Sequence, residues 1–243
     1  MTSGGTDRET ITIDITRTAV ALTAVLALLG GCSSRTGSDP NAGQNGDQAG
    51  GQTPAPAPFQ PVESNPDPST KIEGVELTDH AGGLHTLPGQ RVAYDRHPPT
   101  GGAHDEVWAN CNGTVYTRAV RTEHMVHALE HGAVWIAYEP TLLPAADVSA
   151  LAELVDGQPY LMLSPYPGMD TPIALQAWDH QLRVTEAGDE RIDQFVQALR
   201  DNEYTAPEPG APCETDPSLF DTTNPPPFDP SPPGPDAVPV DGP

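Results

Sequence analysis

The chain is poor in basic side chains, and this scarcity limits what it can bind. Only 11 of its 243 residues are Lys or Arg, against 34 Asp and Glu, so the formal net charge is −23. Proteins bind nucleic acid largely by neutralising phosphates with basic groups. A nucleic-acid partner is therefore excluded, whereas an acidic surface suits an exported protein and attracts cations weakly.

Several signatures of catalysis are also missing. The sequence contains no CxxC pair, no phosphate-binding loop, no glycine fingerprint of dinucleotide sites and no recognisable Ser-His-Asp set. Redox chemistry by a CxxC motif is therefore not expected, and neither is nucleotide binding through such loops.

No apolar run is long enough to cross a membrane, but a shorter one lies near the N-terminus. Residues 19–29 are apolar except for Thr23, and they fall short of the ~20 residues that a spanning helix needs. The run follows Arg17 and ends in Leu29-Gly30-Gly31-Cys32, which is typical of a signal peptide and its cleavage site.

This N-terminal segment resembles the bacterial lipoprotein signal. The resemblance implies removal of residues 1–31 and acylation of Cys32, the first residue of the mature protein. We therefore expect a lipid-anchored protein on the extracytoplasmic face of the cell membrane. An ordinary cleaved signal with a coincidental cysteine is the alternative.

Two cysteines remain after Cys32 is set aside, namely Cys111 and Cys213. A compartment outside the cytoplasm permits disulfides. We expect one bridge, which would close a loop of about 100 residues and stabilise the fold by ~4–5 kcal/mol in the chain-entropy model. A metal-ligating or redox role for Cys111 is the alternative.

Composition divides the mature chain into one domain and two flanks. Residues 32–70 form a polar, Gly- and Pro-containing stalk, and residues 214–243 form an acidic, Pro-rich tail without Lys or Arg. Such segments bury too little apolar surface to offset their ordering entropy, so we expect both to be disordered. Residues 71–213 have the length of a single globular domain.

Hydrophobic periodicity predicts an α+β domain. Its elements follow the order β-α-β-α-β-β-α, which allows a thioredoxin-like topology. The predicted helices span 122–131, 144–155 and 189–202, and the predicted strands span 72–77, 91–94, 133–138, 160–164, 173–178 and 181–184.

Histidines are concentrated in one stretch of this domain. His97 and His104 border a Pro/Gly loop, and His124, His127 and His131 follow at i, i+3 and i+7 of a predicted helix. That spacing puts the last three on one helix face. Imidazole is a versatile ligand for zinc and copper, so the clustering predicts a transition-metal site.

Glu130 has two possible roles beside these histidines. It could fix an imidazole tautomer as a hydrogen-bond partner. Alternatively, His127-Ala128-Leu129-Glu130-His131 matches H-x-x-E-H, in which two histidines hold zinc and the glutamate activates water. The second role would make the protein a metal-dependent hydrolase with Glu130 as its catalytic residue.

Six linked segments stand out along this domain: His97-Pro98-Pro99-Thr100-Gly101, Trp108-Ala109-Asn110-Cys111, Val126-His127-Ala128-Leu129-Glu130-His131-Gly132, Ser164-Pro165-Tyr166-Pro167-Gly168, Ala177-Trp178 and Ala206-Pro207-Glu208-Pro209-Gly210-Ala211-Pro212-Cys213. Together, over about residues 90–213, they resemble the bacterial "domain of unknown function 3105" family. The family is largely uncharacterised, so the resemblance implies an exported domain without implying a reaction.

The resemblance sharpens the choice of ligands to His97, His104, His127 and His131, because His124 stands where the family need not have histidine. Four neutral imidazoles favour the binding, storage or delivery of copper or zinc over catalysis. A non-enzymatic envelope module with structural histidines is the alternative, and the distances among the imidazoles discriminate between the two. Whether His124 or the loop residue Met169 joins the site is left open.

Overall fold

A six-stranded sheet organises the part of the chain that the computed structural model describes, residues 57–242. The predicted signal peptide, Cys32 and the first part of the stalk lie outside these residues. Within residues 57–242, no helix is both long and apolar enough to span a membrane.

The sheet has the strand order β1-β9-β8-β6-β7-β5. Its members are β1 (Glu76–Leu77), β5 (Asn112–Val115), β6 (Val134–Tyr138), β7 (Leu161–Pro165), β8 (Ile173–Ala177) and β9 (His180–Val184). The helices are α1 (Thr122–Glu130), α2 (Ala145–Val155), α3 (Arg191–Leu199) and the short 3-10 helix η1 (Pro68–Lys71). Four two-residue strands lie outside this sheet. Three of them precede β5 in the chain, namely β2 (His85–Thr86), β3 (Val92–Ala93) and β4 (His104–Asp105), and the fourth is β10 (Val238–Pro239) near the C-terminus.

The α+β class is confirmed. From β5 to α3 the chain runs β-α-β-α-β-β-β-α, with three strands between α2 and α3 where the predicted order had two. Strands β5 and β6 both pair in parallel with β7, whereas β8 pairs antiparallel with β6 and β9. This connectivity is that of a thioredoxin-like topology in which a loop replaces the helix between β7 and β8.

The first strand of this pattern is β5, which the sequence did not reveal. It begins with Asn112 and Gly113, residue types that strands disfavour, and only Thr114 and Val115 of its four residues are β-branched. The pairing with β7 shifts register here, and Gly113 has a φ of +70°. A Cβ on Gly113 would lie 2.3 Å from the Gln158 nitrogen, so the close approach of this edge strand requires glycine.

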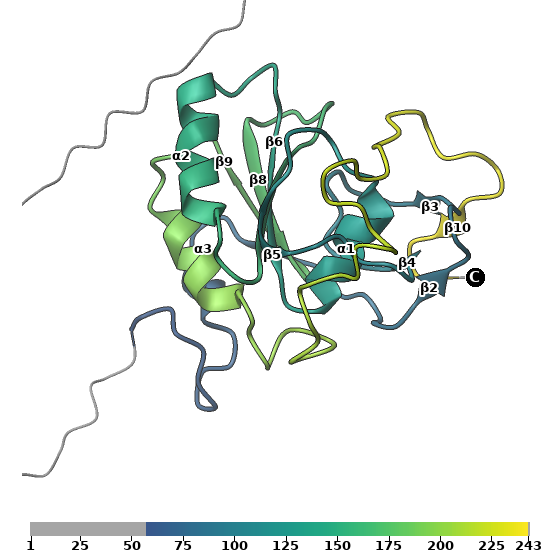
Figure 1. Cartoon of the computed structure of the whole chain (residues 1–243). Helices are drawn as coiled ribbons and strands as arrows, with labels where there is room; N and C mark the ends of the chain where they lie inside the picture. The colour runs from purple at the N-terminus through teal and green to yellow at the C-terminus, as the bar shows by residue number, and fades with distance from the viewer. Residues whose placement is uncertain (1–56, 243) are drawn as a thin grey trace, which may run out of the picture. The chain divides into compact units, whose positions relative to one another are not determined.

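Helices α2 and α3 lie on one face of the sheet and α1 lies on the other (Figure 1), and each face carries its own apolar layer. Successive side chains of a strand point to opposite faces, so Ile136 packs towards α2 and α3 while its neighbour Trp135 packs towards α1. Strand β6 is buried along most of its length, as its continuous apolar run predicted. Helix α1 therefore has a face of the sheet to itself.

Helix α1 is unusual because every one of its nine residues is buried. It begins at Thr122, the first residue of the helix predicted over 122–131. Gly132, with a φ of +94°, follows its end, because glycine adopts this left-handed conformation readily. A helix buried all round must be covered on the side away from the sheet as well, and segments from both ends of the domain supply that cover.

One covering segment is the C-terminal one, so the prediction of a disordered tail is wrong for residues 214–242. Phe220 is only 1% exposed and contacts the ring of Tyr116. Strand β10 pairs in parallel with β3, and Pro227 bridges to Val120. A few apolar residues spaced among prolines suffice for docking, because proline's fixed φ lowers the entropy lost on ordering.

The N-terminal border also lies earlier than predicted. Phe59 packs against the apolar layer under α2 and α3, and the amide of Asn202 donates to the Pro66 carbonyl oxygen at 2.9 Å. Residues 57–70 are therefore part of the folded unit, although composition assigned them to the stalk.

Replacing Phe220 tests whether the C-terminal segment is integral to the fold. We expect Phe220→Ala to lower the free energy of unfolding by ~3–5 kcal/mol, the usual cost of truncating a buried Phe. Its neighbour Leu219 is 62% exposed, so Leu219→Ala should change stability by less than ~0.5 kcal/mol. If urea titration gave the same free energy of unfolding for both variants, this packing would be contradicted.

Candidate metal centre

Two short strands and one helix bring the principal histidines together. Strands β2 and β4 pair in parallel with His85 opposite His104, and the two rings are 5.0 Å apart. Helix α1 supplies His127 and Glu130, which lie three positions apart and so share a helix face. The ring of His127 is 4.7 Å from that of His104 and 4.9 Å from that of His85.

These four residues form a compact donor set, here called group A: His85, His104, His127 and Glu130. Each offers one ligand atom, and the four atoms all lie within 4.8 Å of one another. His104, His127 and Glu130 are buried, whereas the His85 side chain is 40% exposed. Group A therefore has three interior donors and one donor that faces solvent.

The buried imidazoles have a defined tautomer. Nδ1 of His104 is 2.7 Å from the Gly102 carbonyl oxygen, and Nδ1 of His127 is 2.7 Å from that of Asp105. A carbonyl oxygen only accepts, so each Nδ1 carries the proton and each Nε2 keeps its lone pair. Metal-ligating histidines are usually oriented by such a bond on the nitrogen away from the metal.

Two of these interior donors lack a satisfactory hydrogen bond. Nε2 of His104 and Oε2 of Glu130 are buried without a well-oriented partner, yet they lie only 3.0 Å apart. A lone pair and a carboxylate oxygen at this distance repel unless a proton or a cation lies between them. The arrangement is therefore suited to a positive charge at this point.

The pKa values are consistent with a site that holds its donors unprotonated. Burial, reinforced by the neighbouring His104, lowers the pKa of His127 to about 3. Burial raises the pKa of Glu130, but attraction to a protonated His104 imidazole and the hydrogen bond from the Gly83 amide outweigh burial and lower it overall. His127 therefore presents a free lone pair and Glu130 a negative charge at neutral pH.

A second donor set, group B, adjoins the first and consists of His127, His131 and Glu208. Nδ1 of His131 donates to the Pro212 carbonyl oxygen at 2.8 Å, and its Nε2 is 3.5 Å from Oε2 of Glu208. The rings of His127 and His131 are 4.7 Å apart. Trp108 lies beside both, with its ring 5.4 Å from His127 and 4.7 Å from His131.

A family model described as "Protein of unknown function (DUF3105)" matches residues 85–215. The chain belongs to the DUF3105 family. The match begins at His85 and spans every donor of groups A and B. No curated protein and no solved structure matches the chain.

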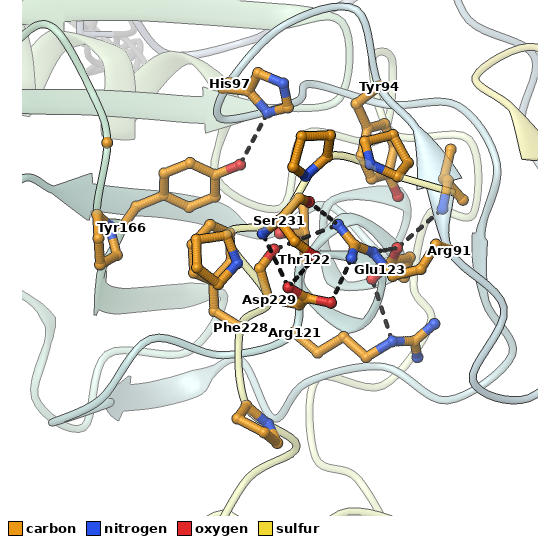
Figure 2. A pocket seen from close by; sticks show the side chains of 17 residues that line it. Arg91, Tyr94, His97, Arg121, Thr122, Glu123, Tyr166, Phe228, Asp229 and Ser231 are labelled. Atoms are coloured by element: carbon orange, nitrogen blue, oxygen red, sulfur yellow. Dashed lines mark hydrogen bonds and ion pairs between the residues drawn. The ribbon is translucent and has the colours of Figure 1, made fainter. Parts of the chain in front are cut away.

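The DUF3105 domain does not bring the four sequence-predicted ligands into one set. His104 and His127 belong to group A, whereas His131 belongs to group B. His97 belongs to neither group. Its Nδ1 is 3.2 Å from the Tyr166 hydroxyl in a cavity of about 410 Å³ that Tyr94, Arg121 and Phe228 also line (Figure 2).

The two ends of the Pro/Gly loop are held by different elements, which explains the separation of His97 from His104. Side chains of β9 bind the start of the loop: Gln181 donates to the Pro98 carbonyl oxygen at 2.9 Å and Arg183 to that of His97 at 3.3 Å. The end of the loop pairs with β2 through His104. The Pro/Gly loop therefore does not bring the imidazoles of His97 and His104 into one site.

His85 was missed because it lies in a Gly-containing stretch outside the histidine-rich segment 97–131. Only the pairing of β2 with β4 brings it to His104. Glu130 was expected to be an imidazole partner or a catalytic base, and its carboxylate instead lies within group A. Helical spacing relates His127 to Glu130, but no local signal relates His85 or His104 to them.

The remaining candidates lie outside both groups. Both ring nitrogens of His124 are engaged, because Nδ1 donates to the Val107 carbonyl oxygen at 2.5 Å and Nε2 accepts from Arg121 at 3.2 Å. His124 thus has the bonding of a structural histidine. Met169 is buried in the apolar layer on the α1 side of the sheet.

The cysteines form the expected bridge. Cys111 and Cys213 are disulfide-bonded at a sequence separation of 102, so Cys111 is not a metal ligand or a free thiol. The bridge holds the segment that contains Glu208 and Pro212 beside α1, where the Glu208 amide donates to the Glu130 carbonyl oxygen at 3.1 Å. The position of Glu208 and Pro212 beside group B therefore depends on the disulfide.

Removal of the disulfide should be costly. We expect the variant Cys111→Ala/Cys213→Ala to unfold with a free energy lower by ~4–5 kcal/mol, because the unfolded chain regains the entropy of a long loop. Urea titration measures the change, and reduced wild-type protein should match the double variant. An unchanged unfolding midpoint would contradict a stabilising role for the bridge.

Proposed function

We propose that this DUF3105 protein binds one divalent transition-metal ion, zinc or copper, through His85, His104, His127 and Glu130. The observation that carries the proposal is the pair of buried acceptors, Nε2 of His104 and Oε2 of Glu130, which face each other at 3.0 Å without a well-oriented hydrogen bond. A bound cation would turn that repulsion into two ligand bonds.

The donor types favour particular metals. Three imidazoles and one carboxylate are a typical set for Zn²⁺ and also suit Cu²⁺. Cuprous ion prefers thiolate or thioether sulfur, and both described cysteines are consumed by the disulfide. The proposal is therefore for a divalent ion.

A purely structural role for the histidines is less consistent with their bonding. In His124 both nitrogens have partners within the protein. In His104 and His127 only Nδ1 is bonded to a backbone oxygen, while Nε2 points into group A. Histidines that merely buttressed the loop against α1 would be expected to resemble His124.

Hydrolysis through the H-x-x-E-H motif is also less well supported. That motif needs both histidines on one metal and a glutamate free to activate water. Here His131 stands with Glu208 in group B, and Glu130 is fully buried with Oε1 accepting from the Gly83 amide. Four protein donors also fill a tetrahedral site, which favours binding or delivery over catalysis.

We further propose that Cys32 carries the lipid that anchors this domain to the extracytoplasmic face of the membrane. The signal-like segment before Cys32 supports this location, and the disulfide fits an oxidising compartment. The metal would then be one that is available outside the cytoplasm.

Metal analysis of the purified mature protein tests the binding proposal. After exposure to Zn²⁺ or Cu²⁺ and dialysis, we expect about one ion per chain, and His104→Ala or Glu130→Gln should weaken binding by at least ~10-fold. His97→Ala is the matched control, since His97 lies outside both groups, and it should retain the ion. Equal metal in wild-type protein and His104→Ala would refute the proposal.

Detergent phase separation tests the anchor. We expect the full-length protein to partition into the detergent phase when it is produced in a bacterium that processes lipoproteins, because two acyl chains suffice for stable membrane binding. Cys32→Ala should move it to the aqueous phase, and mass spectrometry of the N-terminal peptide should lose the lipid mass. Wild-type protein that stays aqueous would contradict acylation.

A further inference from the structure

Group B is not used by the proposed function, although it touches group A at one residue. His127, His131 and Glu208 have ligand atoms within 4.8 Å of one another. His131 is buried, whereas the Glu208 side chain is 46% exposed. Group B therefore extends from the interior to the surface. Its exposed donor, Glu208, belongs to a different part of the chain from His85, the exposed donor of group A.

The shared residue can serve only one group at a time. Nδ1 of His127 donates to the Asp105 carbonyl oxygen, which leaves Nε2 as its only free ligand atom. One imidazole nitrogen binds one metal ion. Groups A and B therefore cannot both use His127 at once, and an ion held by one group excludes an ion held through His127 by the other.

The neighbouring contacts keep group B ready for a ligand. The Pro212 carbonyl oxygen fixes the His131 tautomer so that Nε2 faces Glu208, and Pro212 precedes the disulfide-bonded Cys213. The Glu208 amide is tied to the end of α1 through the Glu130 carbonyl oxygen. The three donors thus come from α1, from the residue that follows it and from one cross-linked segment.

We propose that group B is a second, transient metal site, through which a divalent ion loads into group A by transfer across His127. This inference rests on the proposed function. Glu208 first attracts the ion from solvent, and His131 and His127 then hold it. The ion stays on Nε2 of His127 while its bonds to Glu208 and His131 are exchanged for bonds to His104 and Glu130. No bond to the protein other than metal–ligand bonds forms or breaks.

Transfer of the ion from group B to group A is favourable because group A has more donors. Group B offers three ligand atoms and group A four, and Glu130 in group A is a buried carboxylate whereas Glu208 is partly solvated. Coulomb attraction to a cation is stronger where water is excluded. Occupancy at equilibrium should therefore lie in group A, with group B affecting mainly the rate.

Stopped-flow fluorescence with Cu²⁺ alone as the probe tests the proposal in the mature protein. Trp108 lies next to both His127 and His131, so quenching of tryptophan fluorescence reports the arrival of the paramagnetic ion. We expect Glu208→Gln and His131→Ala to slow loading by about 10-fold while the equilibrium stoichiometry stays at one ion. Trp108→Phe should remove most of the early signal.

The matched control is Glu214→Gln, which neutralises another exposed acid close to the disulfide and outside both groups. It should load at the wild-type rate, so a general loss of electrostatic attraction is distinguished from loss of group B. A second measurement uses His104→Ala, in which weak residual binding should persist and should vanish in His104→Ala/His131→Ala.

The outcomes separate this inference from the proposed function. Wild-type protein that retains no ion would overturn both. Wild-type protein that retains an ion, together with unchanged loading rates in Glu208→Gln and His131→Ala, would overturn the transfer alone. Two ions bound simultaneously per chain would also overturn it, because the shared His127 forbids double occupancy.

Discussion

The structure depends on a carboxylate buried at the end of a buried helix. Glu130 is the last residue of α1 and is fully inaccessible to solvent. An isolated ionised carboxylate in such a place would cost several kcal/mol, so partners must surround it. The Gly83 amide donates to Oε1, and Oε2 faces Nε2 of His104 at the point where the proposed cation would bind both. The backbone carbonyl of Glu130 also accepts from the Glu208 amide, which ties a third segment to this end of α1.

Each of these partners comes from a different segment, and this explains how the domain covers α1. The glycines before β2 let the chain approach closely, since a Cβ on Gly82 would lie 2.9 Å from Oε1 of Glu130 and 2.8 Å from Pro207. The disulfide holds the segment around Glu208 on one side. The C-terminal segment covers the other through Phe220 and the pairing of β10 with β3. The groups that bury Glu130 are thus the ones that assemble the two donor sets.

Much of the scaffold was predictable from local signals. The apolar run of β6, the glycine after α1 and the apolar stripe of α3 at Ile192, Phe195 and Leu199 are all visible in the sequence, and the structure has a strand or helix at each. These features depend on backbone preferences and on one-sided burial, which neighbouring residues report directly. The flanks were misjudged because composition reflects an average, whereas docking of residues 214–242 relies on single side chains such as Phe220.

The two donor sets could be predicted only in part from local sequence signals. The sequence by itself determined that histidines gather near α1, because i, i+3 and i+7 spacing is a property of one helix, and it determined which cysteines were available to pair. Only the tertiary structure decided that His85 joins His104 through strand pairing, that His97 turns to Tyr166, and that His127 stands between two groups. Those contacts join segments far apart in the chain, and the geometry of long-range pairing leaves no trace in the local pattern of residues.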